Sequence, residues 1–298
     1  FSEGRKRGPS PLEKKEREAA ALIERAMAIK GIPGLAVAVS VDGRIVWEQG
    51  FGLADIETGA KCTARTVMRI ASISKPITST VAALLVDRGK LDLDKPVQHY
   101  LPDFPVKQFN NSDTVITTRM LLSHRSGIRH YEKKGEKKLL SDGDLRTSEF
   151  YSNKPYNGVQ DAVKMFADDE LVSEPGNSFT YTTHGFTLAA AVMEKASGER
   201  FDRLLDDLFR RIGMRSSCVD ANPTIIVNRA KYYLRNKRGT LENTPEVDCS
   251  YKWAGGGILS TAADLLAFAN AILYSHQYAV GEGASQSKPL ISRETCAQ

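Results

Sequence analysis

Cysteine is scarce in this sequence, and no metal or redox motif is built from it. The four cysteines include no Cys-x-x-Cys pair: Cys62, Cys218, Cys249 and Cys296. Such scattered cysteines fit a reducing or weakly oxidising compartment, although their number would allow two disulfide bridges. The five histidines also lack metal-ligand spacing. We therefore expect neither a metal ion nor another cofactor.

Long apolar runs are absent as well. A membrane helix needs roughly 18 consecutive apolar residues, and Asp264 interrupts the longest stretch that approaches this length, Ile258–Tyr274. We expect a soluble protein with no transmembrane segment. The sequence opens with Phe1 instead of Met, so we expect that any targeting peptide was removed or lies outside the sequence.

A large excess of one charge is missing too. The chain has 41 basic and 36 acidic residues, a formal net charge of +5. Apart from Arg5-Lys6-Arg7, the basic residues are mixed with acidic ones. This mixture indicates an ordinary solvated surface and no nucleic-acid partner.

The 298 residues, 41% of them hydrophobic, are enough for a sizeable core. Residues 1–11 are charged and contain Pro and Gly, so we expect them to be disordered. We interpret 12–298 as a single domain. Residues 131–158 contain a Lys/Glu-rich run and few apolar side chains, which indicates a charged surface insert.

The first ordered elements are a helix and a hairpin. Residues Leu12–Ile29 have helical periodicity, and their expected apolar face is Leu22, Ile23, Ala26 and Ile29. Gly31-Ile32-Pro33-Gly34 ends the helix. Two apolar runs then flank Asp42-Gly43, which is typical of a β-hairpin. A helix next to a hairpin predicts an α/β domain.

The stretch most suggestive of chemistry is Ser72-Ile73-Ser74-Lys75. Residues three apart on a helix share a face, so Lys75 can approach the Ser72 hydroxyl. Pro76 is tolerated only in the first helical turn, which places the start of the helix near Ser72. Few charges follow, and burial would favour the neutral amine that a general base requires.

Two other patterns are weaker. Ser285-Gln286-Ser287-Lys288 repeats the Ser-x-x-Lys spacing but lies in a polar stretch, so we interpret it as a loop. His124 lies between Ser123 and Ser126, but side chains one or two apart do not face each other on a helix. We therefore favour a loop or capping role for His124.

Together, five stretches in order resemble the serine β-lactamase and penicillin-binding protein family, especially its class C-like branch and the animal mitochondrial proteins within it. They are 31–34, 69–76, the short helix ending at Ser126-Gly127, 174–181 and 253–261. The resemblance implies a β-lactamase/transpeptidase-like fold: an antiparallel sheet flanked by helices, with a mostly helical subdomain.

The same resemblance implies that Ser72 is the nucleophile of an acyl-enzyme, Lys75 its general base, and a tyrosine a proton relay. Tyr151-Ser152-Asn153 matches the family's Tyr-x-Asn letters but lies in the insert. Tyr181-Thr182-Thr183 departs at the third position, yet it precedes an apolar helix as the family arrangement requires. We favour Tyr181, and assign Thr183 and Gly256 to substrate binding.

One family motif is not found. A Lys-Thr-Gly or His-Thr-Gly strand should follow 255–261 and supply one of two oxyanion-hole N–H groups, the other being that of Ser72. No such sequence follows. We expect the sequence to be a fragment that lacks the C-terminal strands, which would leave the hairpin with an open edge.

The resemblance implies a mitochondrial serine protease that is linked to lipid metabolism and acts on a peptide or ester, with the intermembrane space as its candidate compartment. Two alternatives stay open. One is an esterase, D,D-peptidase or β-lactamase-like activity. The other is a self-associating, filament-forming protein with reduced or no catalysis.

Overall fold

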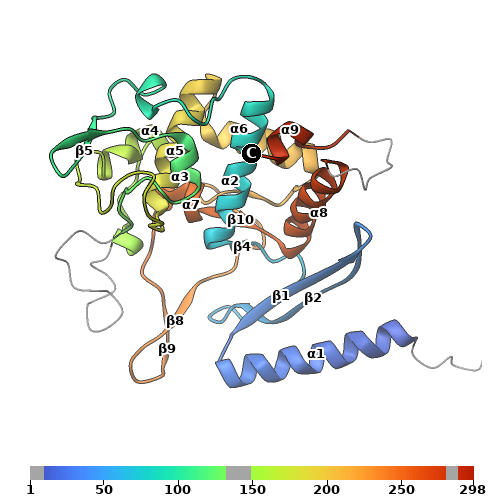
Figure 1. The fold of residues 1–298 in the computed structure, drawn as a ribbon. Helices are drawn as coiled ribbons and strands as arrows, with labels where there is room; N and C mark the ends of the chain where they lie inside the picture. The colour runs from blue at the N-terminus through green and yellow to red at the C-terminus, as the bar shows by residue number, and fades with distance from the viewer. Residues whose placement is uncertain (1–9, 132–148, 280–287) are drawn as a thin grey trace, which may run out of the picture.

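A helical body rests on a β-hairpin in the computed structural model, which describes residues 10–131, 149–279 and 288–298 (Figure 1). The N-terminal half comprises α1 Pro11–Lys30, β1 Gly34–Val41, β2 Arg44–Asp55, β3 Ala60–Lys61, β4 Met68–Arg69, η1 Ala71–Ile73, α2 Ser74–Asp87, η2 Val97–His99, β5 Lys107–Phe109, β6 Ser112–Thr114 and α3 Thr118–Leu122. The remainder comprises η4 Glu149–Tyr151, α4 Val159–Ala162, η5 Val163–Met165, α5 Thr183–Ser197, α6 Phe201–Ile212, β7 Cys218–Val219, β8 Tyr233–Arg235, β9 Leu241–Asn243, η6 Ser250–Lys252, α7 Trp253–Gly256, β10 Ile258–Ser260, α8 Ala262–Ala279 and α9 Arg293–Cys296.

All strand pairs within the sheets are antiparallel. One sheet has the order β1-β2-β3 and another has the order β4-β10-β7, while β5-β6 and β8-β9 form two-stranded ribbons. Asp42 and Gly43 both have positive φ, as the tight turn between β1 and β2 requires. The predicted hairpin and the predicted combination of antiparallel strands with helices are confirmed.

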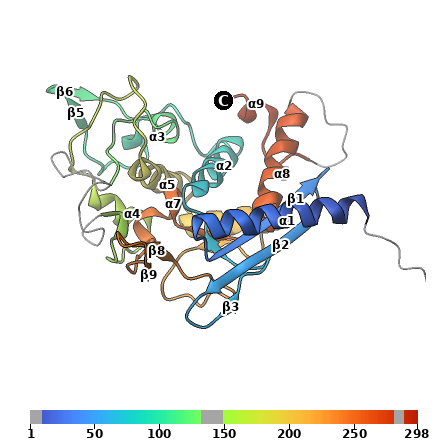
Figure 2. The same ribbon diagram turned by 90° about the horizontal axis from the view of Figure 1, so that it is seen from below.

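Helix α1 lies across the outer side of the hairpin, and α8 packs on β1 and β2 (Figure 2). The predicted helix is present, but the predicted apolar face is wrong. Leu22 and Ile29 are 68% and 71% exposed, and Met27 is the residue of α1 that is buried. Met27 lies near Gly52 of β2, so the face of α1 that packs on the hairpin differs from the predicted face.

The core lies between α2, α5, α6 and α7. Ile77, Val81, Leu84 and Leu85 of α2 are buried there and form the apolar face of this helix. Residues Thr183–Met193 of α5 are buried on every side. The N-terminal ends of α2 and α5 therefore lie next to α7, with which both helices are in contact.

Two short elements lie in the C-terminal third of the chain. The β8-β9 ribbon follows the loop after β7, and α9 lies close to the C-terminal residue Gln298. Ser292 caps α9 by accepting from the N–H of Thr295. Residues 1–9, and most of the predicted insert, lie outside the described residues.

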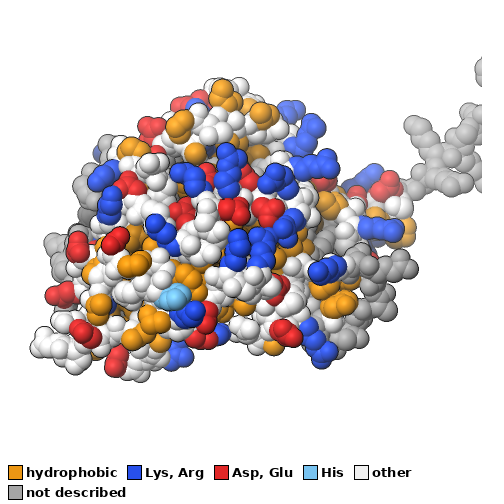
Figure 3. Space-filling view, turned by 90° about the horizontal axis from the view of Figure 1, so that it is seen from above, with side chains coloured by type: hydrophobic (Ala, Val, Ile, Leu, Met, Phe, Trp, Pro, Cys, Tyr) orange, Lys and Arg blue, Asp and Glu red, His pale blue; other side chains and the backbone are white. Residues whose placement is uncertain are grey.

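The surface carries both charges. On the face in Figure 3, Lys and Arg side chains are interspersed with Asp and Glu. All four cysteines are free thiols. In the part of the chain that the structure describes, no helix is long and apolar enough to cross a membrane.

Candidate active site

Ser72 lies in the turn that joins β4 to α2. Ala71, immediately before it, has a φ of +48°, a left-handed conformation that residues with a Cβ rarely adopt. This turn leaves Ser72 exposed in η1, just ahead of α2, which begins at Ser74. Pro76 is the third residue of α2, within the first turn as predicted.

Two side chains contact the Ser72 hydroxyl. The hydroxyl of Tyr181 lies 2.6 Å from Ser72 Oγ, and Lys75 Nζ donates a hydrogen bond to the same Oγ over 3.2 Å. Two of the predicted partners of Ser72 are thus in direct contact with it. A hydroxyl held between an amine and a phenol can pass its proton to the amine, either directly or through the phenol hydroxyl as a relay.

Lys75 is buried, with 6% of its surface exposed. Its Nζ donates to the carbonyl of Gly255 over 2.6 Å and to Thr183 Oγ1 over 3.4 Å. Among the described residues no carboxylate forms an ion pair with it. Burial lowers the pKa of the Lys75 ammonium, and the contact with Tyr181 opposes this only in part. Burial thus makes the neutral amine easier to form than in an exposed lysine.

Tyr181 immediately precedes Thr182, the residue that caps α5. The Thr182 hydroxyl accepts from the N–H of Gly185, which satisfies one free donor of the helix. The Lys75 ammonium also lies 4.6 Å from the centre of the Tyr181 ring. The rival tyrosine, Tyr151, lies in η4 and packs against the core. The structure thus brings Tyr181 to the nucleophile.

The glycines of α7 form the adjacent wall. A Cβ on Gly255 would lie 2.5 Å from Cγ2 of Thr183, so only glycine allows this close approach of α7 to α5. A Cβ on Gly256 would have Ala71 as its nearest neighbour, at 3.8 Å. Of the two predicted binding residues, Thr183 therefore contacts Lys75, and Gly256 lies next to Ala71, the residue before Ser72.

Glu149, which lies in the predicted surface insert, is half-buried and binds side chains of the protein body. Glu149 binds Arg129 through contacts of 2.7 and 2.9 Å, and it lies 3.1 Å from Nε2 of His184. Asp169 binds the same guanidinium at 2.6 Å. Burial lowers the pKa of His184, so its contact with Glu149 is a hydrogen bond of a neutral ring.

Sequence reasoning missed three contributors to the site. Nothing in the pattern singled out His130, whose ring lies edge-on to Tyr181 with centroids 5.4 Å apart. Glu149 lay in the predicted insert, and the Gly255 carbonyl is a backbone group. The Gly255-Gly256-Gly257 run was the one available signal, because consecutive glycines indicate close backbone approach.

The second Ser-x-x-Lys match begins outside the described residues. His124, given a loop role, lies 4.4 Å from the Tyr181 ring between centroids. Within the described ranges, no group of three His, Cys, Asp or Glu residues is placed to hold a metal ion.

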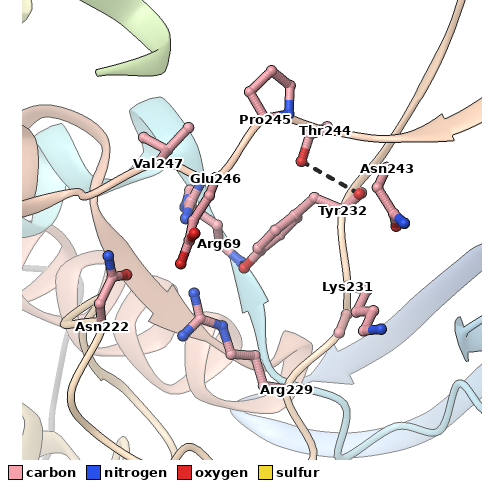
Figure 4. Close-up of a pocket in the computed structure, with 11 residues that line it drawn as sticks. Arg69, Asn222, Arg229, Lys231, Tyr232, Asn243, Thr244, Pro245, Glu246 and Val247 are labelled. Carbon is pink, nitrogen blue, oxygen red and sulfur yellow. Dashed lines mark hydrogen bonds between the residues drawn. The ribbon is translucent and has the colours of Figure 1, made fainter. Parts of the chain in front are cut away.

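A separate cavity of about 620 Å³ lies beside β4 (Figure 4). Arg69 and Arg229 line it, and both guanidinium groups bind the buried carboxylate of Asp220, at 2.6 and 2.7 Å. Arg69 also stacks over the Tyr232 ring, 4.5 Å from its centre. This cluster anchors the strand that leads into Ser72. None of the residues that contact the Ser72 hydroxyl lines the cavity.

Ser72, Lys75 and Tyr181 meet at the ends of two helices, beside antiparallel strands. This arrangement is typical of proteins that use a serine as a nucleophile. The family model described as Beta-lactamase matches residues 19–294, and the chain belongs to that family. The resemblance drawn from the sequence is confirmed.

Among curated proteins, "Serine beta-lactamase-like protein LACTB, mitochondrial" of Mus musculus is 39% identical over 91% of this chain and 59% of its own length. The Homo sapiens protein of the same name is 38% identical over 89% and 58%. "Esterase EstB" of Burkholderia gladioli is 30% identical over 68% and 51%. The chain thus spans about three-fifths of the length of the LACTB proteins.

Solved structures show the same fold. A D-amino acid amidase from Ochrobactrum anthropi has a TM-score of 0.74 at 22% identity, with 96% of this chain and 74% of the amidase covered. A penicillin-binding protein homologue from Pyrococcus abyssi has a TM-score of 0.73 at 24% identity, with 94% and 59% covered.

Proposed function

We propose that the protein is a serine hydrolase that forms an acyl-enzyme on Ser72. The observation that supports this most directly is the position of Ser72 Oγ, between the Tyr181 hydroxyl at 2.6 Å and the Lys75 amine at 3.2 Å. Membership of the β-lactamase family supports a serine hydrolase in general. The residue roles are our proposal.

In the first half-reaction Ser72 Oγ attacks a substrate carbonyl. A carbon–oxygen bond forms, and the Oγ proton passes to the neutral Lys75 amine, directly or through Tyr181. The tetrahedral intermediate then expels an amine or alcohol, which takes up that proton. We assign Ser72 N–H to the oxyanion hole, as the resemblance implies. In the second half-reaction water attacks the acyl carbonyl, the bond to Ser72 Oγ breaks, the carboxylic acid leaves and a proton from the water returns to Ser72 Oγ.

We propose a peptide or an ester as the substrate. The names of similar proteins include an esterase and an amidase, which supports carbonyl substrates with either leaving group. A β-lactam undergoes the same attack and is the alternative substrate. Peptide, p-nitrophenyl ester and chromogenic cephalosporin substrates would separate these activities, with the Ser72→Ala variant as the common blank.

A fluorophosphonate probe tests the nucleophile in the full-length protein. We expect labelling of the wild type and none of Ser72→Ala. Ser72 is exposed, so its substitution should leave the fold intact, and equal melting temperatures would verify this. A folded wild type that takes no label would overturn the proposal. Labelling that persists in Ser72→Ala would assign the nucleophile elsewhere.

We also propose that the protein works in mitochondria, supported by the names of its LACTB relatives. Colocalisation of the full-length protein with a matrix or intermembrane-space marker would test the compartment. Lipid metabolism, self-association and filament formation stay predictions of the resemblance. Sedimentation of wild type and Ser72→Ala would separate assembly from catalysis, because a structural role predicts polymers in both.

A further inference from the structure

Tyr181 packs against two histidine rings that the reaction above does not use. The segment that carries it, 180–183, runs along the loop 124–130. The N–H of Thr180 donates to the carbonyl of His124 over 2.7 Å, and the hydroxyl of Thr182 donates to the carbonyl of Arg129 over 2.6 Å. The two histidines stand at the two ends of this contact.

His124 binds the segment through its ring. Nδ1 accepts a hydrogen bond of 3.1 Å from the N–H of Thr182, the residue that follows Tyr181. The ring also packs on the Tyr181 ring, with centroids 4.4 Å apart and planes 34° apart. Phe186 lies 5.2 Å away between ring centroids. His124 thus contacts Tyr181 both through the backbone and through the ring face.

His130 makes the equivalent bond one residue further along. Its Nδ1 accepts from the N–H of Thr183 over 3.2 Å, and its ring is edge-on to Tyr181, 5.4 Å between centroids. Tyr131 also packs against the His130 ring, with centroids 4.1 Å apart. The Thr182 and Thr183 N–H groups lie at the start of α5, where the helix supplies no acceptor of its own.

We propose that His124 and His130 are positioning residues that hold the Tyr181 hydroxyl on Ser72 by accepting the two backbone N–H groups that follow Tyr181. The inference rests on the proposed role of Tyr181 in proton transfer. A displacement of about 1 Å at a reacting group can cost on the order of 100-fold in rate. Two hydrogen bonds and a packed ring face limit such displacement.

The bonds define one tautomer for each ring. A nitrogen that accepts a hydrogen bond carries no proton, so both rings are neutral with the proton on Nε2. The surroundings support this state, because burial and the nearby Lys75 ammonium lower the pKa of His124 to about 4. Burial, His184, Lys75 and His124 lower that of His130 to about 4, against the opposing charge of Glu149.

The variants should distinguish the effect of the hydrogen-bond acceptor Nδ1 from the effect of ring packing. His124 has a φ of +59°, which Asn and Gly adopt more readily than other residues. His124→Asn keeps an acceptor near the Nδ1 position, whereas His124→Gly removes it without backbone strain. His130→Asn and His130→Leu form the matching pair. His276→Leu is the control, because His276 is exposed on α8.

The catalytic measurement is kcat and KM for an ester in the full-length protein. We expect kcat to fall about 10–100-fold in His130→Leu and His124→Gly, with KM changed less than threefold. The Asn variants should recover most of this loss. Equal loss in the Asn and non-accepting variants, at unchanged melting temperature, would overturn the inference.

A second measurement does not depend on catalysis. Amide exchange should be slow at Thr182 and Thr183 in the wild type, fast at Thr183 in His130→Leu, and slow again in His130→Asn. ¹⁵N NMR should show both rings with the proton on Nε2. If the enzyme shows no activity but these signatures hold, the proposed function fails and the arrangement of the histidines stands. Unprotected amides, or rings protonated on Nδ1, would overturn the inference itself.

Discussion

The Tyr181 hydroxyl lies 2.6 Å from Ser72 Oγ, although 109 positions separate the two residues in the chain. The bond joins the ends of α2 and α5, two buried helices that meet α7. Tyr181 is still 38% exposed, so a substrate can reach the hydroxyl pair from solvent.

The first prediction removes this hydroxyl. Tyr181→Phe should lower the acylation rate by about 10²–10⁴-fold, the usual contribution of a positioned proton-transfer group. The ring remains, so the melting temperature should change little. Stopped-flow acylation by an ester measures the effect. Tyr151→Phe is the matched control, and a comparable loss of rate there would contradict the choice of Tyr181.

The second prediction concerns Lys75. Lys75→Met should abolish acylation, and the melting temperature should stay equal or rise, because a buried cation without a carboxylate partner is replaced by an apolar chain of similar length. Calorimetry and probe labelling measure the two effects. A sharp drop in melting temperature would show that the ammonium stabilises the fold.

The second prediction extends to the pH dependence of acylation, because Lys75 is the proposed base. Since burial lowers the pKa of Lys75, the rate should rise with pH and level off below the ordinary lysine value of 10.5. Rates between pH 6 and 10 measure this midpoint. A rate that is flat over this range would argue against Lys75 as the base.

The glycines of α7 give the third prediction. Gly255→Ala places a Cβ 2.5 Å from Thr183, so α5 and α7 must separate at a cost of about 1–3 kcal/mol. Gly256→Ala meets nothing closer than 3.8 Å and should keep its stability while altering KM. Urea unfolding compares the two. Equal destabilisation would contradict the packing described for α7.

The fourth prediction is acid destabilisation by the histidines. His124 and His130 have folded pKa values of about 4 against an ordinary value of 6.5. The unfolded chain therefore binds more protons in this interval, and stability should fall as pH decreases from 6.5 toward 4. The pKa of Glu149 is lowered from 4.5, so the stability that its carboxylate contributes is lost below that pH.

Urea midpoints at pH 7.5 and 5.0 measure this effect. The pair His124→Asn and His130→Asn should reduce the dependence, and the buried His184, whose pKa is also lowered, should account for a remainder. Arg129 and Tyr131 keep their charge states over this range. An unchanged dependence in the double variant would mean that both rings titrate normally.

Local patterns predicted much of the fold and the reacting pair. The helix after Ser72 was predictable because Pro76 marks its first turn and few charged residues follow. The context of Tyr181, ahead of an apolar helix, distinguished it from Tyr151. These features depend on neighbours within a few residues of each other.

The remaining features depend on contacts between distant segments. Sequence reasoning gave His124 a loop or capping role because its serine neighbours cannot face it. The residue that donates a hydrogen bond to its ring, Thr182, is 58 positions away in the chain. Glu149 binds Arg129 from within a polar stretch. The buried face of α1 was mistaken because helical periodicity permits several faces, and the hairpin decides which one is covered.

The most direct test of the account is mass spectrometry of the full-length protein quenched within milliseconds of mixing with an activated ester. We predict a mass increase equal to the acyl group, located on the peptide that contains Ser72, absent in Ser72→Ala and slow to form in Tyr181→Phe. Turnover without an adduct on Ser72, or an adduct on another residue, would contradict it.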